Sequence, residues 1–152
     1  GKDGNNLESV KDFLHRTFNT DITDKTLFYA NKRKFNCLGC SDKALWLSFE
    51  DFFSSPCASE DFIEIVKTFE WVFISNFHVC NDDHIDKIRR FISFIDIAYQ
   101  ENQKLKCFYD LNLMINLYSG DQLHHLWVRT ESRLHQIAST KYLQNLEKKE
   151  TK

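Results

Sequence analysis

The sequence predicts an α/β fold in which a small antiparallel β-meander is followed by a strand–helix–strand parallel unit and a long C-terminal helix. Two observations carry this prediction. The run Trp71–Ile74 is built from β-branched and aromatic residues, and a second strand is predicted at Leu105–Tyr109. Between them, from Asn81 to Tyr99, apolar residues recur at steps of three and four, as in an amphipathic helix. Two strands joined through a helix by short links indicate a right-handed parallel crossover.

The first third of the chain is predicted to contain one helix and three short strands. Leu7–Phe18 alternates apolar and charged residues with helical spacing. Strands are predicted at Thr26–Ala30, Lys34–Leu38 and Ala44–Phe49, with Gly39 in the turn after the second of them. These three strands would form the antiparallel meander.

Two helical segments are predicted before the parallel unit. Phe49–Phe53 is expected to form one helical turn, and the single proline, Pro56, then breaks the chain. A helix is predicted at Ser59–Phe69, with Ser59 as its cap and acidic residues in its first turn.

The last third is predicted to be helical. Leu111–Tyr118 is compatible with a short helix. Ser119–Gln122 matches a capping box, with Ser119 as the cap and Gln122 three residues later. The long C-terminal helix is therefore expected at Asp121–Leu146.

Length and composition fit one domain over residues 1–152. Hydrophobic residues make up 42% of the chain, which is enough for a packed core and argues against disorder. We expect residues 1–6 to be a tag-derived or trimmed end, and residues 147–152 to fray as a charged tail.

Charge and hydropathy exclude two classes of partner. The formal net charge of -2 provides no electrostatic attraction for nucleic acid. The longest apolar run, at 71–77, is far shorter than the roughly 20 residues that a membrane-spanning helix needs.

The cysteines and histidines are weak metal candidates. Five cysteines, an odd number, do not suggest a secreted disulfide framework and favour a reducing compartment. Cys37 and Cys40 have the spacing of a zinc or redox pair, but a zinc site would need two more ligands, and His78 with Cys80 is the nearest pair in sequence. Two unliganded thiols are the favoured interpretation. The adjacent His124 and His125 would point about 100° apart on a helix and could not chelate one ion together.

Two arginine pairs are candidates for binding an anion. Arg89 and Arg90 lie three and four residues after Asp86, so ion pairs along the helix are the favoured interpretation, with phosphate or partner contact as the alternative. Arg129 and Arg133 lie one helical turn apart and could jointly meet an anion. Alternatively, they pair with Asp121 or Glu131, or with nothing.

Motifs for self-contained catalysis are absent from the 152 residues. The sequence has no Gly-x-x-x-x-Gly-Lys-Ser/Thr, no His-Glu-x-x-His and no Gly-x-Ser-x-Gly, and it contains only four glycines. A phosphate-cradling loop is therefore excluded within this chain, and so is nucleotide hydrolysis by this chain alone.

Several ordered blocks resemble the ZapE family of AAA-type P-loop ATPases, which has bacterial members and mitochondrial, LACE-type members. The segment Arg89–Tyr99 resembles the family's Arg-Arg-Phe-Ile-x-Leu-Ile-Asp-x-x-Tyr-Asp. Further matching blocks are Trp46-x-x-Phe49-Glu50-x-Phe52, Ala58-Ser59-Glu60-Asp61-Phe62, Tyr118-Ser119-Gly120-Asp121 and Arg129-x-x-Ser132-Arg133-Leu134, ending in Ser139-x-x-Tyr142-Leu143. The chain departs from the family pattern at His78, where the family has proline, and at Phe108-Tyr109, where it has Ser-Ala.

The resemblance implies a function as the carboxy-terminal part of such an ATPase. The family's phosphate-binding loop lies upstream of these blocks, so no cofactor is expected in this chain, and ATP and Mg²⁺ would belong to the parent protein. By the general logic of these machines, arginines here can reach a nucleotide phosphate, and we nominate Arg90 and Arg133. Neighbouring ATPase subunits or other proteins are the expected partners. The expected location is mitochondrial for a eukaryotic protein and cytoplasmic otherwise.

Two alternatives remain open from the sequence. The chain could be a stand-alone, non-catalytic relative that serves as a structural subunit of a larger, perhaps mitochondrial, complex. It could also be a zinc-dependent binding module built on Cys37 and Cys40.

Overall fold

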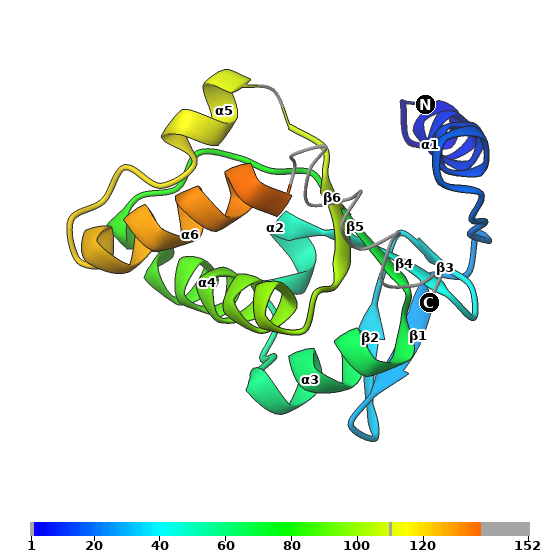
Figure 1. Cartoon of the computed structure of the whole chain (residues 1–152), viewed down its shortest axis with the longest axis horizontal. Coiled ribbons are helices and arrows are strands. Elements are labelled where there is room, and N and C mark those ends of the chain that lie inside the picture. The colour runs from blue at the N-terminus through cyan, green and yellow to red at the C-terminus, as the bar shows by residue number, and fades with distance from the viewer. Residues whose placement is uncertain (1, 110, 138–152) are drawn as a thin grey trace.

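The computed structural model describes residues 2–109 and 111–137. Within them a mixed sheet has helices on both sides, and a separate two-stranded hairpin lies beside it (Figure 1). In chain order the elements are α1 (Lys2–Phe18), β1 (Leu27–Ala30), β2 (Arg33–Asn36), β3 (Gly39–Cys40), β4 (Ala44–Ser48), α2 (Phe49–Phe52), α3 (Ser59–Thr68), β5 (Trp71–Ser75), the 3₁₀ turn η1 (Asp82–His84), α4 (Ile85–Gln100), β6 (Lys104–Cys107), α5 (Leu111–Asn116) and α6 (His124–Ile137). The α/β class predicted from the sequence is confirmed.

The mixed sheet has the order β3-β4-β5-β6, and its last three strands are parallel. The predicted crossover β5–α4–β6 is present, and it is preceded by a second one, β4–α3–β5. The predicted antiparallel pairing of the strand at Ala44–Phe49 is present, but the sequence did not predict that this strand also pairs in parallel with β5. The strand pairs antiparallel with the short β3 on one edge, while its other edge is free to take β5.

The two faces of the sheet bury different residues because side chains alternate along a strand. Leu45 and Leu47 of β4 face the larger core, with α2, α3, α4 and α6. Ala44 and Trp46 face a smaller core under α1, where Trp71 of β5 also lies. In Figure 1, α1 accordingly lies on the side of the sheet away from α3 and α4.

β1 and β2 form their own two-stranded antiparallel sheet, so the predicted meander is split into two parts. Asn31 and Lys32 both have positive φ, 53° and 62°, which is the backbone of a tight two-residue hairpin turn. Gly39 was predicted in a turn and instead lies in β3 opposite Trp46. A Cβ at Gly39 would stand 2.7 Å from the carbonyl oxygen of Thr23, so this strand position requires glycine because of a close backbone approach.

The start of α3 differs from the prediction by one residue. The cap is Ala58, not Ser59. The carboxylate of Asp61 accepts a hydrogen bond from the Ala58 N–H at 2.9 Å, so the stabilising side chain sits in the first turn. The predicted helical turn at Phe49–Phe53 is confirmed as α2.

The predicted capping box at Ser119–Gln122 is wrong. The Ser119 hydroxyl donates to the Cys80 carbonyl oxygen, and α6 begins only at His124. Asp82 accepts from the backbone N–H groups of Asp121 and Gln122 instead, at 3.0 and 3.4 Å. A carboxylate distant in sequence thus takes the role predicted for a local cap. The part of the predicted last helix beyond Ile137, and the predicted frayed tail at 147–152, lie outside the described residues.

Candidate functional site

Arg90, the first nominated arginine, projects from α4 toward the loop that precedes α3. The inward stripe of α4 is apolar, and it includes Ile88, Phe91 and Ile95, all fully buried. Arg90 flanks this stripe and is half-buried. Its Nη1 donates a hydrogen bond to the carbonyl oxygen of Phe53 at 3.1 Å. This single bond fixes the guanidinium and leaves most of its five N–H donors available.

A hollow of about 280 Å³ lies between α4 and the start of α3. Its lining consists of Cys57, Ala58, Ser59, Phe62, Asp86, Arg89, Arg90 and Ser93. The hydroxyl oxygens of Ser59 and Ser93 lie 3.4 Å apart across it. The predicted ion pairs of Arg89 and Arg90 with Asp86 are absent among the described residues.

The electrostatics of this hollow favour an anion. Two guanidinium groups outweigh the one carboxylate of Asp86 that lines it. The backbone N–H groups of Ser59 and Glu60, in the first turn of α3, have no acceptor earlier in the helix. The serine hydroxyls add neutral donors. Phosphate and carboxylate are the groups that such a set of donors recognises.

Cys57 is the thiol of the hollow, and it is not a nucleophile at neutral pH. Burial raises the pKa of Cys57 to about 11, while the nearby Arg90 acts in the opposite direction. The thiol donates to the carbonyl oxygen of Phe52 at 3.5 Å. It therefore remains protonated and serves as part of the wall.

Arg133, the second nominated arginine, is held by Asp96 of α4. Arg129 Nη2 lies 3.1 Å from Asp96 Oδ2, and Arg133 Nη1 bonds the other oxygen, Oδ1. The Arg133 guanidinium also lies over the ring of Tyr99, 5.0 Å from its centroid. The two arginines do meet one anion jointly, as the sequence allowed, but that anion is Asp96 rather than a ligand. The predicted alternative partners, Asp121 and Glu131, are not used. We call Asp96, Arg129 and Arg133 the Asp96 clamp.

Asp96 was not predicted as a site residue, although the sequence carries a signal for it. Asp96 interrupts the apolar run from Phe94 to Ile97 in a predicted buried helix. A carboxylate at such a position calls for a cationic partner from another element.

The cysteine and histidine candidates do not come together in one metal site within the described residues. The thiols of Cys37 and Cys40 are buried and donate to backbone carbonyl oxygens, and burial raises the pKa of Cys37 to about 12. Cys80 Sγ lies 3.7 Å from His78 Nδ1. His124 and His125 are exposed at the start of α6. Over residues 2–109 and 111–137, no group of three or more side chains that could hold a metal ion comes together.

The loop after β5 brings together polar groups that the sequence did not single out. His78 Nε2 lies 2.9 Å from Lys87 Nζ, and Asn76 Nδ2 donates to the Ser48 hydroxyl at 3.3 Å. This is the carboxyl end of the parallel strands, where sheets of this kind commonly bind ligands. Because Asn76 and Ser48 bond each other here, we assign these two side chains to holding the loop against the end of the strand rather than to binding a ligand. In the described part of the chain, no helix is both long and apolar enough to cross a bilayer.

Comparison with known proteins identifies the family. Residues 3–146 match the sequence profile described as AFG1-like ATPase. Two curated relatives are the proteins named cell division protein ZapE of Escherichia coli strains K12 and O157:H7, each 27% identical over 113 residues, which is 74% of this chain. The chain spans only 30% of the length of these relatives. No solved structure matches the chain. Because the profile matches nearly the whole chain, which includes the hollow beside Arg90 and the Asp96 clamp, the protein belongs to the AFG1-like ATPase family.

Proposed function

We propose that this chain is the carboxy-terminal part of an AFG1-like ATPase, where it supports subunit packing, nucleotide sensing and partner contact. ATP and Mg²⁺ would be bound by other residues of the polypeptide or assembly. The 152 residues fit neither group by themselves, because they contain no phosphate-binding loop and the described residues hold no cluster of metal ligands. The proposed role is therefore one of sensing rather than hydrolysis.

The observation that carries this proposal is the hollow beside Arg90. It offers two arginines and two serine hydroxyls around a cavity large enough for a phosphate group. Arg90 keeps unused N–H donors, whereas Arg133 is engaged by Asp96 and Tyr99. We therefore assign the contact with a nucleotide phosphate to Arg90. Arg133 is assigned to positioning α6 against α4.

The test is ATP hydrolysis by the complete polypeptide that carries this chain. Arg90→Ala should lower kcat at least about tenfold, since an arginine that reaches the transferred phosphoryl group is worth about 10³–10⁵ and a sensor contact is worth less. Its melting temperature should stay within about 2 °C of the parent protein's, because only one hydrogen bond is lost. The exposed Arg16 of α1 supplies the matched control, Arg16→Ala, which should change neither quantity.

Arg133→Ala separates the two nominated arginines. We expect it to lower the melting temperature by several degrees, and to lower the hydrolysis rate only as far as folding is lost. Unchanged hydrolysis in Arg90→Ala would overturn the sensing role. Co-purification of the chain in a stoichiometric complex that binds no nucleotide would instead favour a structural subunit. For a eukaryotic source, we propose a mitochondrial location on the strength of the family resemblance.

A further inference from the structure

One edge of β2 pairs with β1, and in the described residues the other edge pairs with no strand. In the β1–β2 hairpin, Ala30 pairs with Arg33 next to the two-residue turn, and Phe28 pairs with Phe35. Hydrogen-bonded pairs alternate along such a ladder, and the backbone N–H of Cys37 continues this series by donating to Thr26. The residues between these pairs, Lys34 and Asn36, therefore direct their N–H and C=O groups away from β1. No other strand in the described residues pairs with this edge.

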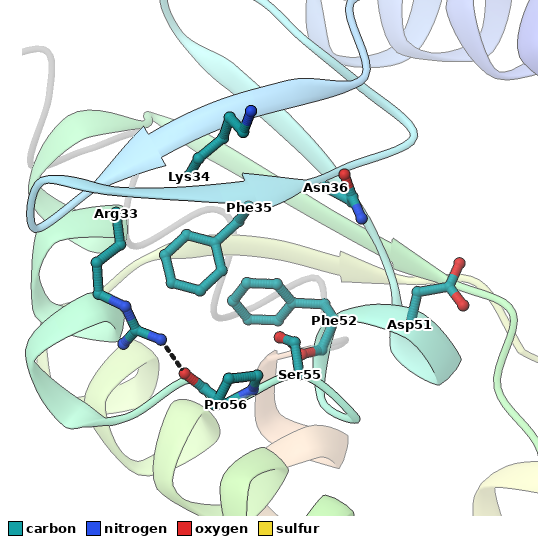
Figure 2. A pocket seen from close by; sticks show the side chains of 8 residues that line it. All are labelled: Arg33, Lys34, Phe35, Asn36, Asp51, Phe52, Ser55 and Pro56. Carbon is teal, nitrogen blue, oxygen red and sulfur yellow. Dashed lines mark hydrogen bonds between the residues drawn. The ribbon is translucent and has the colours of Figure 1, made fainter.

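A hollow of about 270 Å³ adjoins this edge. β2 lines it on one side, and α2 with the segment that follows lines it on the other, through Asp51, Phe52, Ser55 and Pro56. In Figure 2 the rings of Phe35 and Phe52 point toward each other inside it, with centroids 5.6 Å apart. The side chain of Lys34 points away from the hollow, so Lys34 contributes its main chain there (Figure 2).

The wall of the hollow is held rigidly by Arg33. Its Nη1 donates to Asp61 Oδ2 at 2.8 Å, its Nη2 donates to the Pro56 carbonyl oxygen, and its guanidinium lies 5.1 Å from the centroid of the Phe35 ring. Asp61 is fully buried, so this ion pair ties the hairpin to α3. The hollow is thus preformed between two fixed walls rather than opened by a loose hairpin.

The surroundings of the unpaired β2 edge differ in charge between its two ends. Lys32 and Lys34 are exposed at the hairpin end, and neither has an ion-pair partner in the described part of the chain. Glu50 and Asp51 are exposed at the other end. An occupant with an acidic residue near Lys34 and a basic residue near Asp51 would complement both ends.

We infer that this hollow is a docking site for an extended peptide segment of a partner protein, which adds a strand to the free edge of β2. The main chain of the peptide would bond the outward N–H and C=O groups of Lys34 and Asn36. One apolar side chain would enter the hollow over Phe35 and Phe52. This inference goes beyond the nucleotide role proposed above, because no residue of the Arg90 hollow takes part in it.

A second copy of this chain fits the edge less well. In β2 the only large apolar side chain is Phe35, and it is already buried in its own hollow, with 6% of its surface exposed. A copy pairing through the same edge would have no apolar side chain to offer. Lysine on an edge strand also opposes pairing between identical strands.

The test measures binding of a fluorescent six-residue probe peptide with an acidic residue near one end, a central leucine and a lysine near the other end, in the absence of nucleotide. Two N-methylated versions separate strand addition from loose contact. Methylation of the N–H groups in one alternating frame removes the bonds to β2, and methylation in the other frame removes none. We expect at least about tenfold weaker binding for one frame and nearly unchanged binding for the other.

Protein variants test the charge preference. Lys34→Glu should weaken binding of this probe about fivefold or more and favour its charge-reversed version. Lys43→Glu, at an exposed lysine in the β3–β4 turn, is the matched control and should bind as the parent does. Arg90→Ala should also bind normally, which separates this site from the proposed nucleotide contact. Equal loss in both methylated frames, no binding of the probe, or self-association of the chain that Lys34→Glu abolishes would each overturn the inference.

Discussion

The Arg90 hollow contains arginines of α4 and the Asp96 clamp contains arginines of α6 packed against α4, yet the two pairs differ in what they bind. In the clamp, Asp96 from α4 satisfies Arg129 and Arg133 from α6. In the hollow, Asp86 lies nearby and pairs with neither arginine, and within residues 2–109 and 111–137 the one hydrogen bond of the Arg90 guanidinium goes to a backbone carbonyl oxygen. A pair of arginines in the sequence therefore leaves open whether a carboxylate of the same chain or a ligand takes them up. Both regions contain a pair of arginines in the sequence, but only the arginines of the clamp are paired with a carboxylate in the fold.

The side chains of the Asp96 clamp are also partly buried. The side chains of Asp96 and Arg133 are 31% and 26% exposed, so the clamp is partly shielded from water. A partly buried, doubly bonded carboxylate contributes more than a surface ion pair does. The clamp should therefore be visible in stability measurements, whereas the Arg90 hollow should be visible mainly in ligand or rate measurements.

The largest expected effect is the loss of stability when a buried side chain of α4 is shortened. Ile92→Ala removes a side chain that is 4% exposed in the larger core, and it should lower the free energy of unfolding by about 2–5 kcal/mol. Chemical denaturation followed by circular dichroism would measure it. A loss below about 1 kcal/mol would show that α4 packs against the sheet more loosely than the structure indicates.

The next effect concerns the clamp itself. Asp96→Ala leaves two neighbouring arginines without their carboxylate, and it should lower the free energy of unfolding by about 1–3 kcal/mol. The exposed Asp83 supplies a matched control, Asp83→Ala, expected within about 0.5 kcal/mol of the parent. In the Asp96→Ala background, Arg133→Ala should cost much less than it does alone. Additive losses would contradict the assignment of these residues to one unit.

A third comparison uses the carboxylate of Asp82 in η1, the turn that precedes α4. Hydrogen bonds from Tyr118 and from the backbone N–H groups of Asp121 and Gln122 lower the pKa of Asp82 below its ordinary 3.8. This contribution to stability is present above that ordinary pKa and is lost as the pH falls through the lowered value. Asp82→Asn should therefore flatten the acid limb of a plot of melting temperature against pH. An acid limb unchanged by Asp82→Asn would exclude this role.

The smallest expected effect is that of Arg89→Ala. Arg89 is exposed and has no ion-pair partner in residues 2–109 and 111–137, so its removal should change the free energy of unfolding by no more than about 0.5 kcal/mol. The same denaturation assay as for Ile92→Ala applies. A loss comparable to that of Asp96→Ala would make the hollow a structural feature like the clamp and remove the contrast between the two regions.

Local sequence patterns predicted the elements but not their partners. The periodicity of α4 and the apolar run of β5 were sufficient to place both within a few residues. The second crossover was missed because Ala44–Ser48 has an antiparallel partner close in sequence, while its parallel partner, β5, lies beyond α3. The cap at Ser119 was mispredicted because Asp82, far away in the chain, supplies the acceptor instead.

For this protein, the amino-acid sequence alone determined the α/β class, the AAA-type resemblance and the absence of a phosphate-binding loop in these 152 residues. These follow from residue types at fixed short spacings, which a linear pattern contains. Tertiary structure alone decided that Asp96 pairs with Arg133, that Arg90 faces a hollow, and that one edge of β2, beside Phe52, pairs with no other strand among the described residues. Each of these depends on which distant groups come within a few ångströms of each other, and that is set by how the helices and strands pack.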